Sequence, residues 1–213
     1  VLIKVNSETD FAAKSDTFLD FLDNLGKLVL ENNSIIQKQE FLNLKYDSGT
    51  VQDYFNSMIA KIGENLILND LIIMENKKSM FSFYIHNSYR KNIGKIISLI
   101  EYSVSDNNIE IETLSKNICM HIAAMKPESM DVEDLDKNLI INEEKIQKEL
   151  ILTSGKPSNI VDKILEGKMK KYFSEITLLN QTYILDQEKT IRDLIKEHSK
   201  SNFKLISFEL INL

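Results

Sequence analysis

The sequence has little of what marks several common classes of protein. A single cysteine, Cys119, excludes an internal disulfide and fits a reducing compartment. No block of Lys or Arg stands out and the formal net charge is −6, which argues against a nucleic-acid-binding surface. No apolar run approaches the roughly 18 residues that span a bilayer. No signal or transit peptide is recognisable at the start of the chain.

Length and composition are those of an ordinary globular protein. With 213 residues, and a prior of about 150 residues per domain, one or two domains are expected. The hydrophobic fraction of 43% and the charged fraction of 27% allow a sizeable core with a solvated surface. The sequence begins without an initiating Met and directly in a strand-like run, which indicates a fragment of a longer protein.

The opening stretch combines a strand with a capped corner. Residues 1–5 alternate and are β-branched, so they predict a strand. Thr9 is placed to cap a helix whose first turn carries Asp10, where the helix dipole favours a carboxylate. Phe11 follows, and its side chain is either folded into the core or presented outward. On the residues alone, the core position is the better prediction.

Apolar residues at helical spacing predict the helices of the first two thirds of the chain. The predicted segments are residues 16–31, 51–62 and 107–125. Gly63 is placed as a left-handed cap after the second of them, and Pro127 stops the third. Between the helices, residues 66–75, 79–86 and 94–102 predict three strands of an antiparallel meander, with a loop over residues 87–92.

The last third of the chain predicts a helical hairpin and a short closing module. Residues 142–153 and 158–176 form two helices around the turn Ser154-Gly155-Lys156-Pro157, with Gly155 capping the first helix and Pro157 starting the second. Ile146 and Leu150 are expected to face the second helix, at the following residues: Val161, Ile164, Leu165 and Met169. So thin a hairpin buries little by itself, which favours a role in meeting a partner or a second copy.

After the hairpin, Thr190 and Asp193 form an approximate capping box. The helix that they open has a buried stripe made of Ile191, Leu194 and Ile195. Residues 203–211 predict a final strand that returns to the sheet.

No enzyme site assembles from the sequence. Cys119 and His121 lie two positions apart on a helix, so their side chains point about 200° away from each other, and His86 is the only other plausible member of such a set. A structural cysteine and a packed histidine are favoured over a ligand pair. The turn at Ser154 lacks the upstream glycines of a phosphate loop, and Pro157 replaces the hydroxyl residue.

Several segments, in the same order, resemble the elongation factor Ts family, the guanine-nucleotide exchange factors of elongation factor Tu. They are Thr9-Asp10-Phe11, Gly63-Glu64-Asn65, Tyr84-Ile85-His86 with Ile93-Gly94, His121-Ile122-Ala123-Ala124, and the turn at residues 154–157. The resemblance runs from Val1 to about Leu210. Two departures are a longer loop between His86 and Ile93, and Gln181-Thr182-Tyr183 where most relatives have Gln-Pro-Phe.

The resemblance implies an α+β fold. It consists of two core subdomains, each of antiparallel sheet plus helices, with an inserted antiparallel coiled-coil hairpin and a short C-terminal helical module. The implied bounds are an N-terminal core subdomain at residues 1–65, a sheet-and-helix core with the C-terminal module at residues 66–128 and 174–213, and the hairpin at residues 129–173. A three-helix N-terminal module of the family is missing, so weaker binding of the partner is expected.

The resemblance also implies a function as an exchange factor rather than an enzyme. Phe11 would insert beside the magnesium site of elongation factor Tu, with Asp10 fixing its position. His86 and the 87–92 loop, at the opposite edge of the sheet, would be a second contact and the Thr190 helix a third. The implied partner-binding residues are Thr9, Asp10, Phe11, Ala12, His86, Asn87, Ile93, Gly94, Thr190 and Leu194. GDP, GTP and magnesium would belong to the partner, so no cofactor, metal, nucleic acid or membrane is expected.

Two alternatives remain open at this point. One is a non-catalytic helical-hairpin dimerisation or scaffold protein with no GTPase partner, and the other is an enzyme that uses Cys119 or the histidines. A homodimer is compatible with either the hairpin or the sheet as its interface. The Asn, Lys and Ile bias suits a low-GC genome, and the bacterial cytoplasm is the expected location, with an organellar matrix as the less favoured one.

Overall fold

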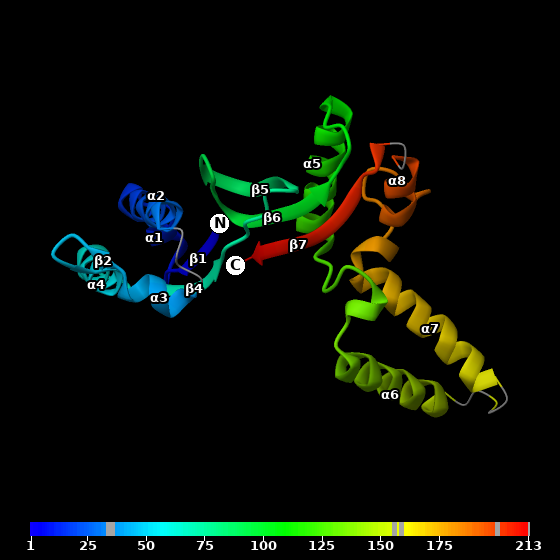
Figure 1. Cartoon of the computed structure of the whole chain (residues 1–213). Coiled ribbons are helices and arrows are strands. Elements are labelled where there is room, and N and C mark those ends of the chain that lie inside the picture. Colours follow the sequence, from blue (N-terminus) through cyan, green and yellow to red (C-terminus); the bar gives the residue numbers. More distant parts are fainter. Residues whose placement is uncertain (33–36, 155–156, 158–159, 199–200, 213) are drawn as a thin grey trace. The chain divides into compact units, whose positions relative to one another are not determined.

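The structure is a computed structural model that describes residues 1–32, 37–154, 157, 160–198 and 201–212. The chain forms two compact units. Unit 1 contains Val1–Lys77 and Ile85–Ile97, together with the end of the chain from Ile211. Unit 2 contains Lys78–Tyr84 and Ser98–Leu210. Helices and antiparallel strands are both present, as Figure 1 shows, which confirms the α+β class.

Unit 1 begins with a two-stranded antiparallel sheet. β1 (Leu2–Asn6) pairs with β4 (Ile67–Ile72), with Leu2 opposite Ile72 and a register shift after Lys4. The predicted three-strand meander is therefore wrong, because β4 pairs with β1 and leaves the next two strands to another partner. The physical reason is burial: Val5 and Leu68 are register partners, and both side chains contribute to the core of unit 1.

Between β1 and β4, unit 1 contains further helices and two short strands. They are α1 (Asp10–Ala13), α2 (Asp16–Glu31), α3 (Lys38–Asn43), β2 (Lys45–Tyr46), β3 (Gly49–Thr50) and α4 (Val51–Ile62). The predicted bounds of α2 and α4 are confirmed. Gly63 ends α4 at φ 81°, in the left-handed region that the prediction required.

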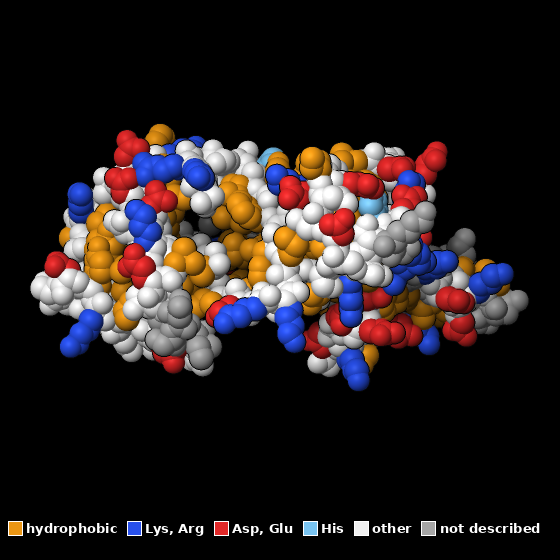
Figure 2. Space-filling view, turned by 45° about the horizontal axis from the view of Figure 1, so that its top comes forward, with side chains coloured by type: hydrophobic (Ala, Val, Ile, Leu, Met, Phe, Trp, Pro, Cys, Tyr) orange, Lys and Arg blue, Asp and Glu red, His pale blue; other side chains and the backbone are white. Residues whose placement is uncertain are grey.

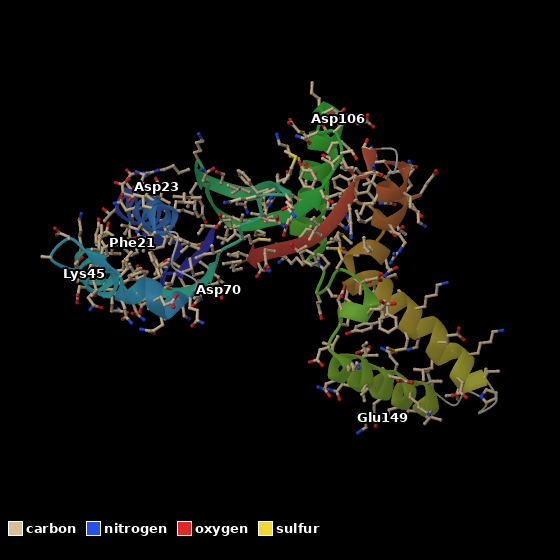
Figure 3. All side chains as sticks on the ribbon, viewed as in Figure 1. Phe21, Asp23, Lys45, Asp70, Asp106 and Glu149 are labelled. Atoms are coloured by element: carbon tan, nitrogen blue, oxygen red, sulfur yellow. The ribbon has the colours of Figure 1, made fainter. Side chains whose placement is uncertain are left out.

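Aromatic rings fill the core of unit 1. Phe21, Phe41 and Phe55 are fully buried. The ring of Phe21 lies edge-on to Phe55 with centroids 4.8 Å apart, and edge-on to Tyr54 at 4.9 Å. Figure 3 labels Phe21 on α2. This cluster joins α2 to α4.

The second sheet has the strand order β5-β6-β7. Its strands are β5 (Met80–Arg90), β6 (Ile93–Ser103) and β7 (Lys204–Asn212), and the last confirms the predicted final strand. The predicted loop at residues 87–92 is wrong, because β5 continues to Arg90 and only Lys91 and Asn92 turn the chain. Asn87 and Asn92 adopt left-handed φ values of 52° and 64°, which asparagine tolerates. Asn87 does so within β5, and Asn92 does so in the turn.

Helix α5 (Ile109–Met125) and helix α8 (Ile191–Glu197) supply much of the core of unit 2. Ile118 of α5 and Ile191 of α8 are fully buried in one cluster with Ile100 and Tyr102 of β6. The single-turn helices η1 (Val132–Asp134) and η3 (Leu178–Asn180) also belong to this unit. None of the helices in the described part of the chain is long and apolar enough to cross a membrane.

Helices α6 (Lys137–Thr153) and α7 (Val161–Ile176) pack side by side in unit 2, as Figure 1 shows. Their shared core contains the following side chains: Ile140, Ile151, Val161, Ile164, Leu165, Met169, Tyr172 and Phe173. The predicted facing pair is wrong, since Ile146 and Leu150 are 51% and 53% exposed. The reason is that α6 begins at Lys137, and Ile140 and Ile151 set its buried face.

Some predictions for this region remain predictions. The turn residues Gly155, Lys156 and Ser158 lie outside the described residues. That the helix pair is a coiled-coil insertion stays an expectation, as do the predicted domain bounds.

Candidate functional site

Phe11 is presented to solvent by a short helix with a fixed start. The Phe11 side chain is 90% exposed, so the core position expected from the residues alone is wrong. Thr9 caps α1 as predicted, because the backbone N–H of Ala12 donates to Thr9 Oγ1 over 3.2 Å. Ala12, the next residue, is buried. The helix therefore packs through Ala12 and leaves the aromatic ring outside.

Glu64 fixes the start of this helix from a distant part of the sequence. Thr9 donates to Glu64 twice, from its backbone N–H to Oε2 over 3.0 Å and from its hydroxyl to Oε1 over 2.6 Å. Glu64 follows Gly63 directly, so the left-handed cap of α4 brings the carboxylate to Thr9. Glu64 belongs to the family segment Gly63-Glu64-Asn65, and its position in the sequence predicts no role for its side chain. Nothing local in the sequence indicates a bond to a residue 55 positions away.

The end of the β5–β6 hairpin lies beside α1 in unit 1. Lys95 Nζ is 3.5 Å from Asp10 Oδ1, and Lys14 Nζ lies 5.9 Å from the centroid of the Tyr89 ring. The structure thus brings the Phe11 segment and the His86–Asn92 segment together within one unit. The expectation that they lie at opposite edges of a sheet is wrong, because Lys95 and Tyr89 of the hairpin contact residues in and next to α1.

Within the hairpin end, exposure separates the predicted contact residues. His86 and Asn87 are exposed, whereas Ile93 is only 9% exposed. A Cβ added at Gly94 would lie 2.3 Å from Ile85 Cγ2, so a side chain at this position collides with the opposite strand. Ile93 and Gly94 therefore support the strand pair, and His86 and Asn87 present side chains to solvent.

Thr190 and Leu194 belong to unit 2. Thr190 caps α8 through the predicted capping box, with its hydroxyl donating to Asp193 Oδ2 over 2.6 Å and Asp193 N donating back over 3.2 Å. Leu194 is 8% exposed and packs in the core beside Ile191. Thr190 is thus near the surface, while Leu194 stabilises the helix from inside.

Charges of both signs are interspersed over the face drawn in Figure 2, and hydrophobic side chains lie between them. This face offers no uniformly basic region of the kind that follows a phosphate backbone. Among the residues that the structure describes, no group of three or more His, Cys, Asp and Glu is arranged to hold a metal ion.

Cys119 and His121 are both fully buried and have separate partners. The Cys119 thiol donates to the backbone oxygen of Ser82 over 3.3 Å, and burial raises its pKa to about 12. A thiol with so high a pKa is not a nucleophile at neutral pH. The interpretation of Cys119 as a structural cysteine is supported by this geometry.

His121 is held in one neutral tautomer. The backbone N–H of Ile184 donates to Nδ1 over 3.3 Å, so the ring proton lies on Nε2, which donates to Gln181 Oε1 over 3.0 Å. The Gln181 amide in turn donates to the backbone oxygens of Glu175 and Met125 over 2.8 and 3.3 Å. Every polar atom of this buried pair has a partner, which favours a packing role.

The protein is expected to become less stable as the pH is lowered, because of His121. Burial lowers the pKa of His121 below its usual value. A histidine in the unfolded chain titrates near pH 6.5, so below that pH the unfolded state binds more protons than the folded state. A difference of one proton lowers the free energy of unfolding by up to about 1.4 kcal/mol for each pH unit. The free energy of unfolding is therefore expected to be constant above about pH 6.5 and to decrease below it.

Urea denaturation between about pH 5 and 7.5 measures this effect, with His121→Gln as the control that has no ring to protonate. The variant is expected to lose stability at neutral pH but to show a weaker dependence below about pH 6.5. Equal pH dependence in the two proteins would show that His121 does not carry it.

Comparison with known proteins agrees with this geometry. A family model described as Elongation factor TS matches residues 8–212. The Elongation factor Ts of Wolbachia pipientis wMel is 36% identical over 100% of this chain and 74% of its own length. That of Ehrlichia canis is 35% identical over 98% of this chain and 74% of its own. That of Rickettsia africae is 36% identical over 94% and 64%. The chain therefore belongs to the elongation factor Ts family of translation elongation factors.

Proposed function

We propose that this chain is a guanine-nucleotide exchange factor that binds elongation factor Tu and promotes the release of GDP. The observation that carries the proposal is the 90% exposure of Phe11 on a helix fixed by Glu64 and Lys95. An aromatic ring kept in water by a fixed backbone is available to enter a pocket of a partner without reorganising its own fold. Membership of the family supplies the partner.

Linkage dictates how such a factor works. It accelerates release only if it binds the nucleotide-free partner more tightly than the GDP-bound partner, and the coupling between the two ligands is reciprocal. Each 1.4 kcal/mol of coupling that lowers the release barrier gives about a tenfold faster release. The chain thus supplies binding energy, forms no bond with the nucleotide and needs no cofactor of its own.

The efficient target on the partner is the site that holds the phosphates and magnesium. Phe11 inserts beside that site, and the Asp10 carboxylate lies at the base of the ring's helix, where Lys95 offsets its charge. His86 and Asn87 form a second contact from the neighbouring hairpin end. Thr190 of α8 forms a third from unit 2. GDP, GTP and magnesium belong to the partner.

Release of a fluorescent GDP analogue from elongation factor Tu tests the proposal. With excess unlabelled GDP present, less than one equivalent of this protein per elongation factor Tu is expected to accelerate release, because one exchange factor acts on many partner molecules in turn. Binding of the nucleotide-free partner, measured by pull-down, is expected to be tighter than binding of the GDP-bound form. No acceleration at saturating chain would overturn the proposal.

A scaffold or dimerisation protein without a GTPase partner is the second candidate. It is favoured by the exposed apolar side chains on α6, which include Ile146 and Leu150. Sedimentation of wild type and Leu150→Lys decides whether this helix mediates self-association. A dimer that Leu150→Lys separates, in a chain that does not bind elongation factor Tu, would favour the scaffold.

Cys119→Ser separates both candidates from an enzyme that uses the thiol. Because Cys119 is buried and its pKa is about 12, the substitution is expected to cost some stability while leaving the exchange rate of the folded protein unchanged. The release assay checks this at a temperature where circular dichroism shows the variant to be folded. A loss of activity in the folded variant would give Cys119 a direct role.

A further inference from the structure

Arg90, near the end of β5, binds three carboxylates of α2. Its Nη1 atom lies 2.5 Å from Asp20 Oδ1 and 3.3 Å from Asp23 Oδ2, and its Nη2 atom lies 3.1 Å from Asp16 Oδ1. We call these four residues the Arg90 cluster. All four belong to unit 1, so the cluster connects the hairpin end to the helix that follows α1.

The spacing of the carboxylates explains why one guanidinium reaches all three. Positions 16, 20 and 23 are four and three residues apart, so the side chains lie along one face of α2. Three like charges along one face repel each other, and the guanidinium offsets this repulsion with its rigid set of donors. The hydrogen bonds that Arg90 donates to Asp20 and Asp23 raise the pKa of Arg90 above its ordinary value, so the guanidinium stays charged.

The Arg90 cluster, with three ion pairs, is accompanied by two further attachments of the hairpin end to the α1 segment. These are the Lys95–Asp10 ion pair and the contact of Lys14 with the Tyr89 ring. His86 and Asn87 lie on the same strand as Arg90, four and three residues before it respectively. The position of their side chains relative to α1 thus depends on attachments that include the Arg90 cluster.

We propose that Arg90 is a positioning residue for nucleotide exchange, which fixes the His86–Asn87 segment beside Phe11 so that both meet the partner as one preformed surface. This inference rests on the proposed exchange function. Arg90 acts through the Arg90 cluster and does not itself contact the partner: its guanidinium donors are directed at α2, and its side chain is 31% exposed.

Loss of the Arg90 cluster is expected to lower the affinity for the partner and to leave the maximal rate of GDP release nearly unchanged. A hairpin end that moves in the free chain must be ordered when the partner binds, and that ordering lowers affinity. Once bound, Phe11 occupies the same pocket, so the maximal release rate is retained. The concentration of chain that gives half-maximal stimulation is expected to rise about tenfold.

Arg90→Gln is the test variant and Lys171→Gln the matched control. Lys171 pairs with Glu175 on α7, is 78% exposed and belongs to unit 2, whereas Arg90 belongs to unit 1. Arg90→Gln is expected to raise the half-maximal concentration and to keep the maximal rate within about twofold, whereas Lys171→Gln is expected to change neither. An unchanged half-maximal concentration in Arg90→Gln overturns the proposal.

Two further measurements distinguish positioning from the other roles open to Arg90. Hydrogen exchange of the free chain, with no partner present, is expected to show faster exchange at residues 85–97 in Arg90→Gln; unchanged protection overturns the proposal even if GDP release proves independent of the chain. The swap Arg90→Asp with Asp20→Arg restores one pair of opposite charges across the same gap, with Asp16 and Asp23 still in place. Rescue of the half-maximal concentration by the swap supports positioning, because a partner that bound Arg90 directly would meet a carboxylate at position 90.

Discussion

Replacing Phe11 with Ala is expected to leave the protein folded and to remove most of its stimulation of GDP release. The ring is 90% exposed, so its removal leaves no cavity and takes almost no apolar surface from the core. In the complex the same ring would be buried, and burial of a Phe side chain contributes about 1.5–3 kcal/mol. If that energy is used in the release step, the stimulated rate falls by roughly ten- to a hundredfold.

Stopped-flow release of a fluorescent GDP analogue measures the effect, and urea denaturation shows whether stability is retained. Phe83→Ala is a matched control, because Phe83 is also exposed, at 51%, and has no role in the proposed contact. Phe83→Ala is expected to stimulate the release of GDP from elongation factor Tu as strongly as the wild type does. Full activity in Phe11→Ala would remove Phe11 from the mechanism, even if the chain proved to be an exchange factor by another contact.

Local patterns in the sequence are sufficient to predict the two long helices of unit 1, whereas the short helix α3 is not predicted. Helix α2 is bounded by a cap at Ser15, and α4 lies between the Thr50 cap and the left-handed Gly63. These signals lie within a few residues of the structure that they determine, and the apolar stripe of each helix has a clear period. The same holds for Thr9 and Thr190, whose capping side chains are confirmed.

Strand pairing was not predictable in the same way. Residues of β4 fit a meander as well as they fit β1, because the alternation of a strand identifies its faces and does not identify its neighbour. The partner was decided by the core of unit 1, where Val5 and Leu68 are buried together. Turn-forming residues also misled at the hairpin end, since Asn87 adopts a left-handed conformation within β5.

In the candidate site too, the residues of a local segment are predictable and those that act through long-range contacts are not. The sequence indicates Thr9, Asp10 and Phe11, because they are contiguous and match a family segment. It does not indicate the roles of Glu64 and Arg90, because each acts on residues that lie 55 to 74 positions away. Contacts of that kind arise only when the core of unit 1 has brought α1, α2 and the hairpin end together.

Phe21→Ala is expected to have the opposite profile to Phe11→Ala, although the substitution is chemically identical and lies in the same unit. Phe21 is fully buried between the rings of Tyr54 and Phe55. Removal of a core Phe side chain costs about 3–5 kcal/mol, from lost burial and from the cavity that remains. Domains are stable by only about 5–15 kcal/mol, so much of unit 1 is expected to unfold under mild conditions.

Urea denaturation followed by far-ultraviolet circular dichroism measures the loss, with Phe11→Ala as the control of equal size and chemistry. At low temperature, where Phe21→Ala remains folded, its stimulation of GDP release is expected to stay near that of the wild type, because the buried Phe21 ring makes no contact with elongation factor Tu. A destabilisation below about 1 kcal/mol would contradict the packing seen around Phe21. Opposite outcomes for the two substitutions would separate the two roles of phenylalanine here: Phe21 maintains the core that positions α1, and Phe11 uses that position to act on the partner.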